Sequence, residues 1–337
     1  TTGTLNASFG DNSFRCNTTG ANNTALGTSV LFNNTTASFN TAVGSEALST
    51  NTTGASNVAV GRLSLKANTT AANNTAVGVC AMLANTTGTP NLALGTSALQ
   101  KNTTAADNVA VGPFSLRCNI TGANNTAVGS SALNANTTGT KNIAVGANAL
   151  LANTSADNNI AMGCGAMLNN TTGSENNAMG SVALCSNTEG TNNTALGHLA
   201  LRANTTADNN TAVGMSALTA NTTGTPNTAF GTSALQTNTT AADNVAIGAF
   251  SLRRNVTGDN NTAVGSSALN ENLGANNTAV GKYTLVSNTT GADNVAVGRN
   301  SLDANTTANY NTAVGSIALG ANTTGAQNTA LGYATLN

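Results

Sequence analysis

Apolar and polar residues alternate in a short segment that recurs along the whole 337-residue chain. In the segment Asn40 to Gly44, Asn is followed by Thr, Ala, Val and a closing glycine, and the same order returns throughout. A period of two places alternate side chains on opposite faces of a β-strand. We therefore predict a short strand before each glycine, with the Thr/Val and Val/Leu positions facing the core and Asn and Ala facing the other way.

The closing glycines, which we call anchors, recur at every seventeenth position, and only the interval between Gly265 and Gly281 is one residue shorter. A unit of this length suits one coil of a parallel β-solenoid, in which coils stack about 4.8 Å apart. The pattern predicts an all-β chain: a single uncapped parallel β-solenoid, or β-roll, of about twenty coils over residues 1–337. The anchors are Gly10, Gly27, Gly44, Gly61, Gly78, Gly95, Gly112, Gly129, Gly146, Gly163, Gly180, Gly197, Gly214, Gly231, Gly248, Gly265, Gly281, Gly298, Gly315 and Gly332.

Asn occupies two positions of every coil that the chain completes, four residues before the anchor and seven after it. Identical amides stacked one coil apart can form hydrogen-bonded ladders. A Leu, Met or Phe four residues after each anchor adds a further inward position, so the predicted core is thin. We predict two ladders, of which Asn40, Asn57 and Asn74 represent the first and Asn51, Asn68 and Asn85 the second.

Charge is scarce, since only 7% of the residues are Asp, Glu, Lys or Arg and the formal net charge is −1. Such a chain has no electrostatic footprint for nucleic acid or for membrane docking. It also has no apolar run of the roughly 20 residues that a spanning helix needs, so we expect no membrane insertion. His198 is the only histidine, and the five cysteines fit no zinc motif. We expect no cofactor, no metal and no catalytic activity.

Asn-x-Thr sequons occur in two positions of the repeat, and the two differ physically. Those that start at the second ladder, such as Asn51, would place a glycan on a stacked amide. Those that start five residues before an anchor use a variable position that also accepts charge. The candidate glycan sites of this second kind are Asn22, Asn73, Asn124, Asn192, Asn209, Asn260 and Asn276.

A longer repeat is superimposed on the coils. Residues 66–91 resemble residues 202–227, and Pro113 to Arg117 resembles Ala249 to Arg253, at an offset of eight coils. Because each coil of a solenoid contacts only its neighbours, a block of coils can be duplicated without disturbing the rest. Duplication in phase favours a role in which length is useful, as in a fibre or stalk. The chain would then be a segment of a longer repeat array or the subunit of a filament.

Asp243 to Gly248 (Asp-Asn-Val-Ala-Ile-Gly) and Asp107 to Gly112 (Asp-Asn-Val-Ala-Val-Gly) resemble the Asn-Ser-Val-Ala-Ile-Gly repeats in the heads of trimeric autotransporter adhesins. The Asn-Thr-Ala-Val-Gly repeats are also similar to those of some viral and phage fibre proteins. The resemblance covers every coil. It implies a left-handed parallel β-roll, three chains side by side, and attachment at a cell or virion surface.

The position two residues after the anchor is often apolar, and it either forms a lateral interface or covers the edge of the roll. We expect a structural extracellular fibre or adhesin-head segment. Its partners would be copies of itself, in a homotrimer or an end-to-end filament, and a host-surface receptor or glycans. The alternative is a soluble β-solenoid that binds ice or another crystal surface through stacked Thr residues. The candidate interface residues are Leu63, Phe114, Leu199, Phe250 and Tyr283.

Overall fold

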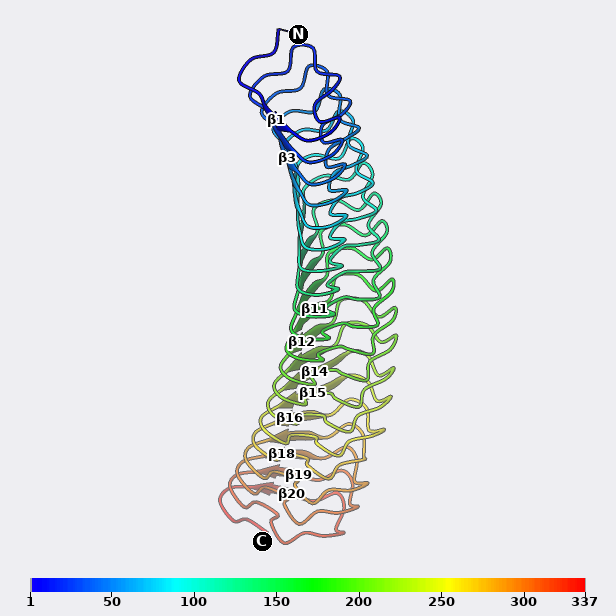
Figure 1. Ribbon diagram of the computed structural model, residues 1–337. Helices are drawn as coiled ribbons and strands as arrows, with labels where there is room; N and C mark the ends of the chain where they lie inside the picture. Colours follow the sequence, from blue (N-terminus) through cyan, green and yellow to red (C-terminus); the bar gives the residue numbers. More distant parts are fainter. Residues whose placement is uncertain (1, 337) are drawn as a thin grey trace. The chain divides into compact units, whose positions relative to one another are not determined.

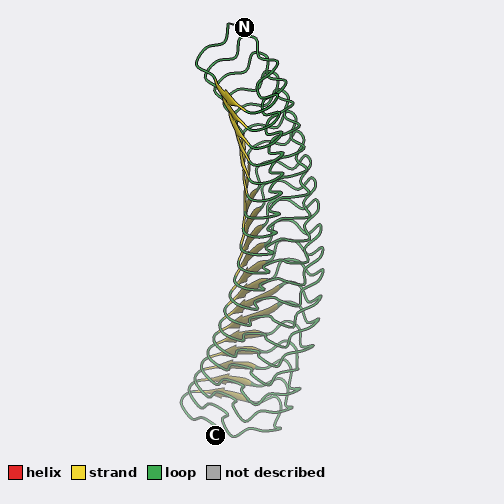
Figure 2. Cartoon of the chain, in the orientation of Figure 1, coloured by secondary structure: helices red, strands yellow, loops and turns green. Residues whose placement is uncertain are grey.

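The computed structural model describes residues 2–336, which form two compact units that divide between Thr172 and Gly173. Each unit is a stack of similar coils, and each coil carries one strand of three or four residues (Figure 1). Strands occupy one side of the coils and turns make up the rest (Figure 2). No helix occurs among the described residues. The predicted β-solenoid of coils about 17 residues long is confirmed.

The first unit contains ten strands, each directly before an anchor glycine. They are β1 (Ala7–Phe9), β2 (Thr24–Leu26), β3 (Thr41–Val43), β4 (Val58–Val60), β5 (Thr75–Val77), β6 (Asn91–Leu94), β7 (Asn108–Val111), β8 (Thr126–Val128), β9 (Ile143–Val145) and β10 (Ile160–Met162).

The second unit repeats this arrangement. Its strands are β11 (Asn177–Met179), β12 (Thr194–Leu196), β13 (Thr211–Val213), β14 (Asn227–Phe230), β15 (Asn244–Ile247), β16 (Thr262–Val264), β17 (Thr278–Val280), β18 (Val295–Val297), β19 (Thr312–Val314) and β20 (Thr329–Leu331).

Within each unit consecutive strands pair in parallel and in register. Between β3 and β4, Ala42 lies opposite Ala59 and Val43 opposite Val60. Hydrogen bonds between coils continue outside the strands: the Leu48 N–H donates to Ser64 O in the next coil at 3.0 Å. Each side chain therefore stacks on the side chain at the same position of the neighbouring coil, which is the geometry that ladders require.

The predicted orientation of the strands was wrong. Asn40 and Ala42 are completely buried, whereas Thr41 is exposed and Val43 is half-buried, and the same pattern holds in other coils. The inner positions thus carry Asn and Ala, and the outer ones carry Thr or Val and then Val, Leu or another large apolar residue. The reason is space, because the coil is so narrow that the inward strand position holds only a methyl group. The Ala stack, which was expected on the outward face, lies inside.

The core of each unit is built from three small apolar positions and the two Asn positions. In the coil of Gly44, Ala42, Ala47 and Leu48 are completely buried. Leu48 lies in the left-handed region with φ of 51°, as do the Leu, Met or Phe residues at its position in the other coils. The inward Leu position was predicted correctly, although its turn conformation was not.

The anchor glycine closes the strand in a conformation that other residues rarely adopt. Gly61 has φ of +130°, and a Cβ added there would lie 2.5 Å from the carbonyl oxygen of Gly78 in the next coil. Both the backbone conformation and the close approach of neighbouring coils therefore require glycine. This accounts for the unbroken anchor positions in the sequence.

The single shortened coil is accommodated without loss of the ladders. Asn272 still donates to Asn255 Oδ1 at 3.3 Å, and the Asn277 N–H still donates to Asn261 Oδ1 at 2.9 Å. The missing residue is absorbed at the corner between these two Asn residues, where Leu273 is exposed. The corner therefore accommodates the shorter coil, and the strand and the ladders keep their geometry.

Candidate functional surfaces

Both Asn ladders are present, and they share acceptors inside the coil. Asn51 Nδ2 donates to Asn34 Oδ1 at 3.2 Å and to Gly54 O at 2.9 Å. Asn40 Nδ2 donates to the same Gly54 oxygen at 3.0 Å. The equivalent carbonyl of the next coil, Ala71 O, likewise accepts from Asn57 and Asn68. One backbone carbonyl per coil thus joins the two ladders.

The first ladder differs from the prediction in its main contact. The Asn57 N–H donates to Asn40 Oδ1 at 2.9 Å, so the side chain of one coil accepts from the backbone of the next. The amide-to-amide contact between the same residues is longer, at 3.2 Å. The Asn74 backbone N–H makes the same bond to Asn57 Oδ1 at 3.0 Å. All six of the predicted ladder residues are completely buried. Their role is structural, and it depends on burial.

A third ladder escaped the sequence reading. Thr52 Oγ1 donates to Thr69 O at 3.0 Å, and Thr35 Oγ1 donates to Thr52 O at 3.1 Å. The first Thr of each Thr-Thr pair therefore links coils through its hydroxyl group, whereas the second, such as Thr53, is exposed. The sequence did contain a signal for this ladder, because the first Thr of the pair recurs at the same position of successive coils.

The outer strand face is the most regular exposed surface of each unit. We define it as the residues three and one before each anchor, which alternate with the buried Asn and Ala. It contains no charged residue. Large apolar side chains on it are strongly exposed, as in Met162 at 41%, Met179 at 43% and Phe230 at 54%. Single exposed apolar residues are common on proteins, but a continuous row is not.

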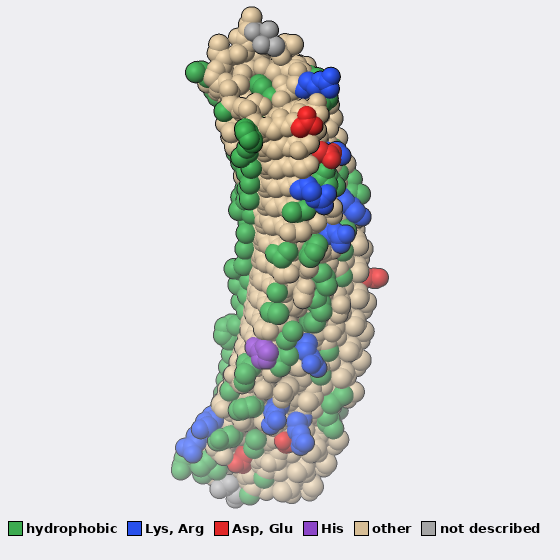
Figure 3. Space-filling model, in the orientation of Figure 1, with side chains coloured by type: hydrophobic (Ala, Val, Ile, Leu, Met, Phe, Trp, Pro, Cys, Tyr) green, Lys and Arg blue, Asp and Glu red, His purple; other side chains and the backbone are tan. Residues whose placement is uncertain are grey.

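Two rows of polar and charged residues border this face. The row five residues before the anchors is mostly acidic where it is charged, with Asp107, Glu175, Asp243 and Asp293 and one Lys141. The row one residue after the anchors is mostly uncharged, and its charged residues are the basic Arg62, Lys282 and Arg299 and the acidic Asp11. On the face that Figure 3 shows, Lys and Arg side chains and some Asp and Glu side chains are scattered among polar and apolar residues.

The seven candidate glycan sites lie in the acidic border row. Asn22, Asn73 and the other five are exposed, with φ of 56° to 61°, so their side chains reach solvent from a turn. Asn51, in the competing sequon position, is completely buried. The structure therefore separates the two sequon classes as the sequence did. Glycosylation itself stays a prediction, which the intact mass of the denatured protein tests.

The five candidate interface residues lie at the corner after the strand, not on the outer strand face. Leu63 and Leu199 are half-buried, and Phe114, Phe250 and Tyr283 are each 39% exposed. All five adopt the left-handed conformation, with φ of 59° to 63°. The aromatic residues each contact a cation: Arg117 lies over Phe114, Arg253 over Phe250 and Lys282 over Tyr283.

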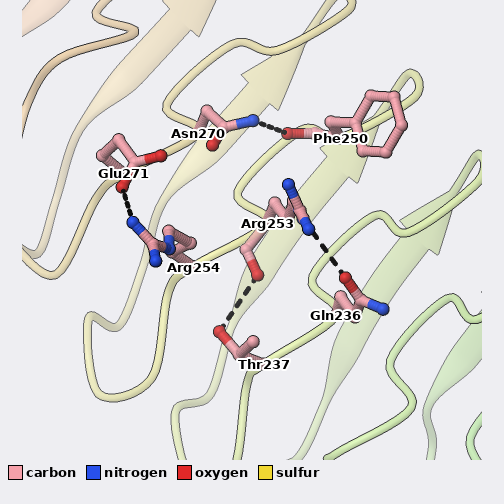
Figure 4. A network of polar contacts seen from close by, with 7 residues as sticks. All are labelled: Gln236, Thr237, Phe250, Arg253, Arg254, Asn270 and Glu271. Atoms are coloured by element: carbon pink, nitrogen blue, oxygen red, sulfur yellow. Dashed lines mark hydrogen bonds and ion pairs between the residues drawn. The ribbon is translucent and has the colours of Figure 1, made fainter.

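Two of these aromatic residues belong to clusters with the same polar contacts in the two units. Figure 4 shows the cluster of the second unit, in which Arg253 Nε donates to Gln236 Oε1 at 3.2 Å and Asn270 Nδ2 donates to Phe250 O at 3.2 Å. The second unit adds an ion pair of 2.6 Å between Arg254 and Glu271. The hydrogen bond and charge of Glu271 raise the pKa of Arg254.

Other candidate chemistry is dispersed. His198 is exposed, and Cys16, Cys80 and Cys118 are unbonded thiols in different coils. Between residues 2 and 336 no group of three or more His, Cys, Asp or Glu side chains is placed to hold a metal ion. The same residues contain no helix long and apolar enough to cross a membrane. Comparison with protein-family models and with curated proteins finds no match to the chain.

Proposed function

We propose that this chain is a structural, non-catalytic segment of an extracellular fibre or adhesin head, and that it associates side by side with copies of itself. The observation that carries the proposal is the outer strand face, a row of exposed Thr and large apolar side chains without charge. Burying such a row stabilises an association by about 25 cal/mol for each Å² of apolar surface removed from water.

A second copy of the chain is the occupant that fits this face best. Side chains on the face repeat once per coil, about 4.8 Å apart. A partner with any other spacing would lose register with these ridges after a few coils, whereas an identical chain keeps register along a whole unit. The interface would therefore grow with the number of coils.

The border rows favour a cyclic arrangement over a two-fold one. In a ring, the acidic border of one chain meets the basic border of the next, because head-to-tail association brings different edges together. Asp293 and Arg299 belong to the same coil, on opposite sides of the face. With neighbouring copies in register, Asp293 of one copy would pair with Arg299 of the next. A ring of three agrees with the resemblance to trimeric adhesin heads, on which the extracellular location also rests.

The native mass of the purified chain, measured by light scattering, tests the proposal. We expect a trimer for the natural sequence and a monomer for the double variant Val77→Asp/Val128→Asp, since both residues lie on the outer strand face. The control is Thr53→Asp/Thr70→Asp, which adds the same charge at exposed corners away from that face.

Circular dichroism of all samples shows whether the variants fold. A natural chain that stays monomeric at high concentration refutes the proposal. An open-ended polymer that the outer-face variant leaves intact refutes the lateral interface in favour of end-to-end filaments.

Ice or crystal binding is a second candidate, because the outer strand face carries stacked Thr residues. Thr194, Thr211 and Thr228 lie at the same position of three consecutive coils, and each is half-buried. Val58, Leu92 and Ile143 interrupt the equivalent stack of the first unit, which favours protein contact over a hydroxyl lattice. The two functions use the same surface. A monomer with thermal hysteresis would establish this second function, and a trimer without it would exclude it.

A further inference from the structure

The two units carry the same cluster of exposed side chains at positions eight coils apart. In the first unit, Arg117 Nε donates to Gln100 Oε1 at 3.2 Å, and its guanidinium carbon lies 5.6 Å from the centre of the Phe114 ring. In the second unit, the corresponding distances from Arg253 are 3.2 Å to Gln236 and 5.5 Å to Phe250. Gln and Arg come from adjacent coils, so the stack itself brings them together.

The backbone that carries the aromatic ring is fixed from two sides. Asn134 Nδ2, one coil further along, donates to Phe114 O at 2.9 Å. The buried Ser115 Oγ donates to Gly112 O at 2.8 Å, where most coils have Ala instead of Ser. Ser251 makes the same bond to Gly248 O, again at 2.8 Å. Each cluster is therefore a preorganised surface feature rather than a chance contact of two long side chains.

A few positions around the clusters differ between the two copies, and the cluster residues do not. Lys101 corresponds to Thr237, Cys118 to Arg254, and Ala135 to Glu271. These exposed or half-buried neighbours changed in size and charge. Gln, Phe, Ser, Arg and Asn of the cluster are the same in both copies. The contacts of the cluster are therefore present in both copies, as are most other residues of the duplicated block.

The arrangement of the guanidinium group determines what it can bind. Because Nε is used by Gln100, the two terminal nitrogens of Arg117 remain for a ligand, and they match the two oxygens of a carboxylate. Among the described residues, neither Arg117 nor Arg253 forms an ion pair with an acidic side chain. The adjacent Phe ring, 39% exposed, offers an apolar surface for the C–H groups of a sugar ring.

We propose that each cluster binds an acidic saccharide, with the carboxylate of a sugar acid on the arginine and the pyranose ring against the phenylalanine. The inference deepens the adhesin part of the proposed function and rests on it, since it names the class of surface ligand. Each chain would carry two equivalent sites, one in each unit. Repetition along a fibre then raises the avidity for a polymer of sugar acids.

Calorimetric titration with a galacturonate hexamer tests this inference, with a neutral maltohexaose as the matched ligand. We expect two sites per chain for the acidic oligomer and none for the neutral one. Arg117→Lys or Arg253→Lys alone should weaken one of the two sites at least about tenfold and leave the other unchanged, because Lys keeps the charge but loses the bidentate geometry. The double variant should lose at least about tenfold in affinity, which corresponds to one charge-assisted hydrogen bond per site.

Arg202→Lys is the control, because Arg202 occupies the same repeat position with Leu199 in place of the phenylalanine. It should leave the binding unchanged. The inference is overturned by absent binding, by equal binding of the neutral sugar, by an equal loss in Arg202→Lys, or by tighter binding of a tetraglutamate peptide. The native mass of the same samples separates the two proposals: a trimer that fails to bind refutes only this site, whereas a monomer refutes the proposed assembly.

Discussion

The inner and outer faces of the strands differ in side-chain size as well as in polarity. On the inner face Ala76 stacks between Ala59 and Ala93, and all three are completely buried. On the outer face Val77 stacks between Val60 and Leu94 and is 38% exposed. Within the strands, the larger apolar residues therefore face outward and the smaller ones inward. This inversion shows that the width of the coil selects the interior residues and leaves an apolar surface for a partner.

The largest expected effect comes from breaking the polar part of the inner face. Asn68 Nδ2 donates to Asn51 Oδ1 at 2.9 Å and to Ala71 O at 3.0 Å, and its Oδ1 accepts from Asn85 at 3.0 Å. Asn68→Ser removes these three bonds, so we expect the free energy of unfolding to fall by about 3 kcal/mol, at about 1 kcal/mol for each bond. Urea denaturation followed by circular dichroism measures the change.

The control for this variant is the same substitution at an exposed Asn. Asn73 lies at a corner where the preceding coil has Ser56 in the same left-handed conformation. Asn73→Ser should change stability by no more than about 0.5 kcal/mol. Equal losses in the two variants would contradict the assignment of the ladder as the main polar support of the fold.

Enlarging the inner Ala tests the space argument directly. Ala76→Leu inserts three heavy atoms between neighbouring coils, and overpacking of this kind costs about 2 kcal/mol. Val77→Leu, one residue later on the outer face, should cost less than about 0.5 kcal/mol, because Leu94 already occupies that position in the next coil. Thermal unfolding of the two variants provides the measurement. An Ala76→Leu protein as stable as Val77→Leu would show that the interior is wider than the structure indicates.

The sequence determined the period, the strands, the anchor glycines and both Asn ladders, since each follows from spacing alone. It did not determine which face is inside. Hydrophobicity ranks Val43 above Ala42 for burial, and only the width of the coil reverses that order. Burial of Asn40 likewise depends on the carbonyl of Gly54 as an acceptor, and no sequence pattern places that oxygen.

The polar contacts of the duplicated clusters could have been found from the sequence. Gln100 and Arg117 occupy the same position of adjacent coils, so a solenoid stacks them on each other. Phe114 was identified as a candidate interface residue, but Arg117 next to it was not. The orientation of the guanidinium group over the ring requires side-chain geometry, which spacing does not supply.

The two residues of each Thr-Thr pair are of the same type but differ in their surroundings, so they allow a direct comparison of a bonded and an exposed position. Thr52 Oγ1 donates to Thr69 O, whereas Thr53 is exposed. Thr52→Val should therefore lower the free energy of unfolding by about 1 kcal/mol, and Thr53→Val should leave it nearly unchanged. Hydrogen exchange of the coil that contains the pair reports the difference. Equal protection in both variants would show that the hydroxyl ladder contributes nothing to stability.

The smallest expected effect has the opposite sign. Ser64 is completely buried, at a position where the preceding coil has Ala47 and the next coil has Ala81, and its Oγ has no hydrogen-bond partner within residues 2–336. Ser64→Ala should therefore stabilise the protein by up to about 1 kcal/mol, because it removes a buried hydroxyl group that has no hydrogen-bond partner. Ser115→Ala should instead destabilise it, since Ser115 Oγ donates to Gly112 O at 2.8 Å. Differential scanning calorimetry of the two variants measures the change in unfolding temperature. The two changes should have opposite signs if a buried hydroxyl group stabilises the inner face only when it has a hydrogen-bond partner. Changes of the same sign would indicate that side-chain volume matters more.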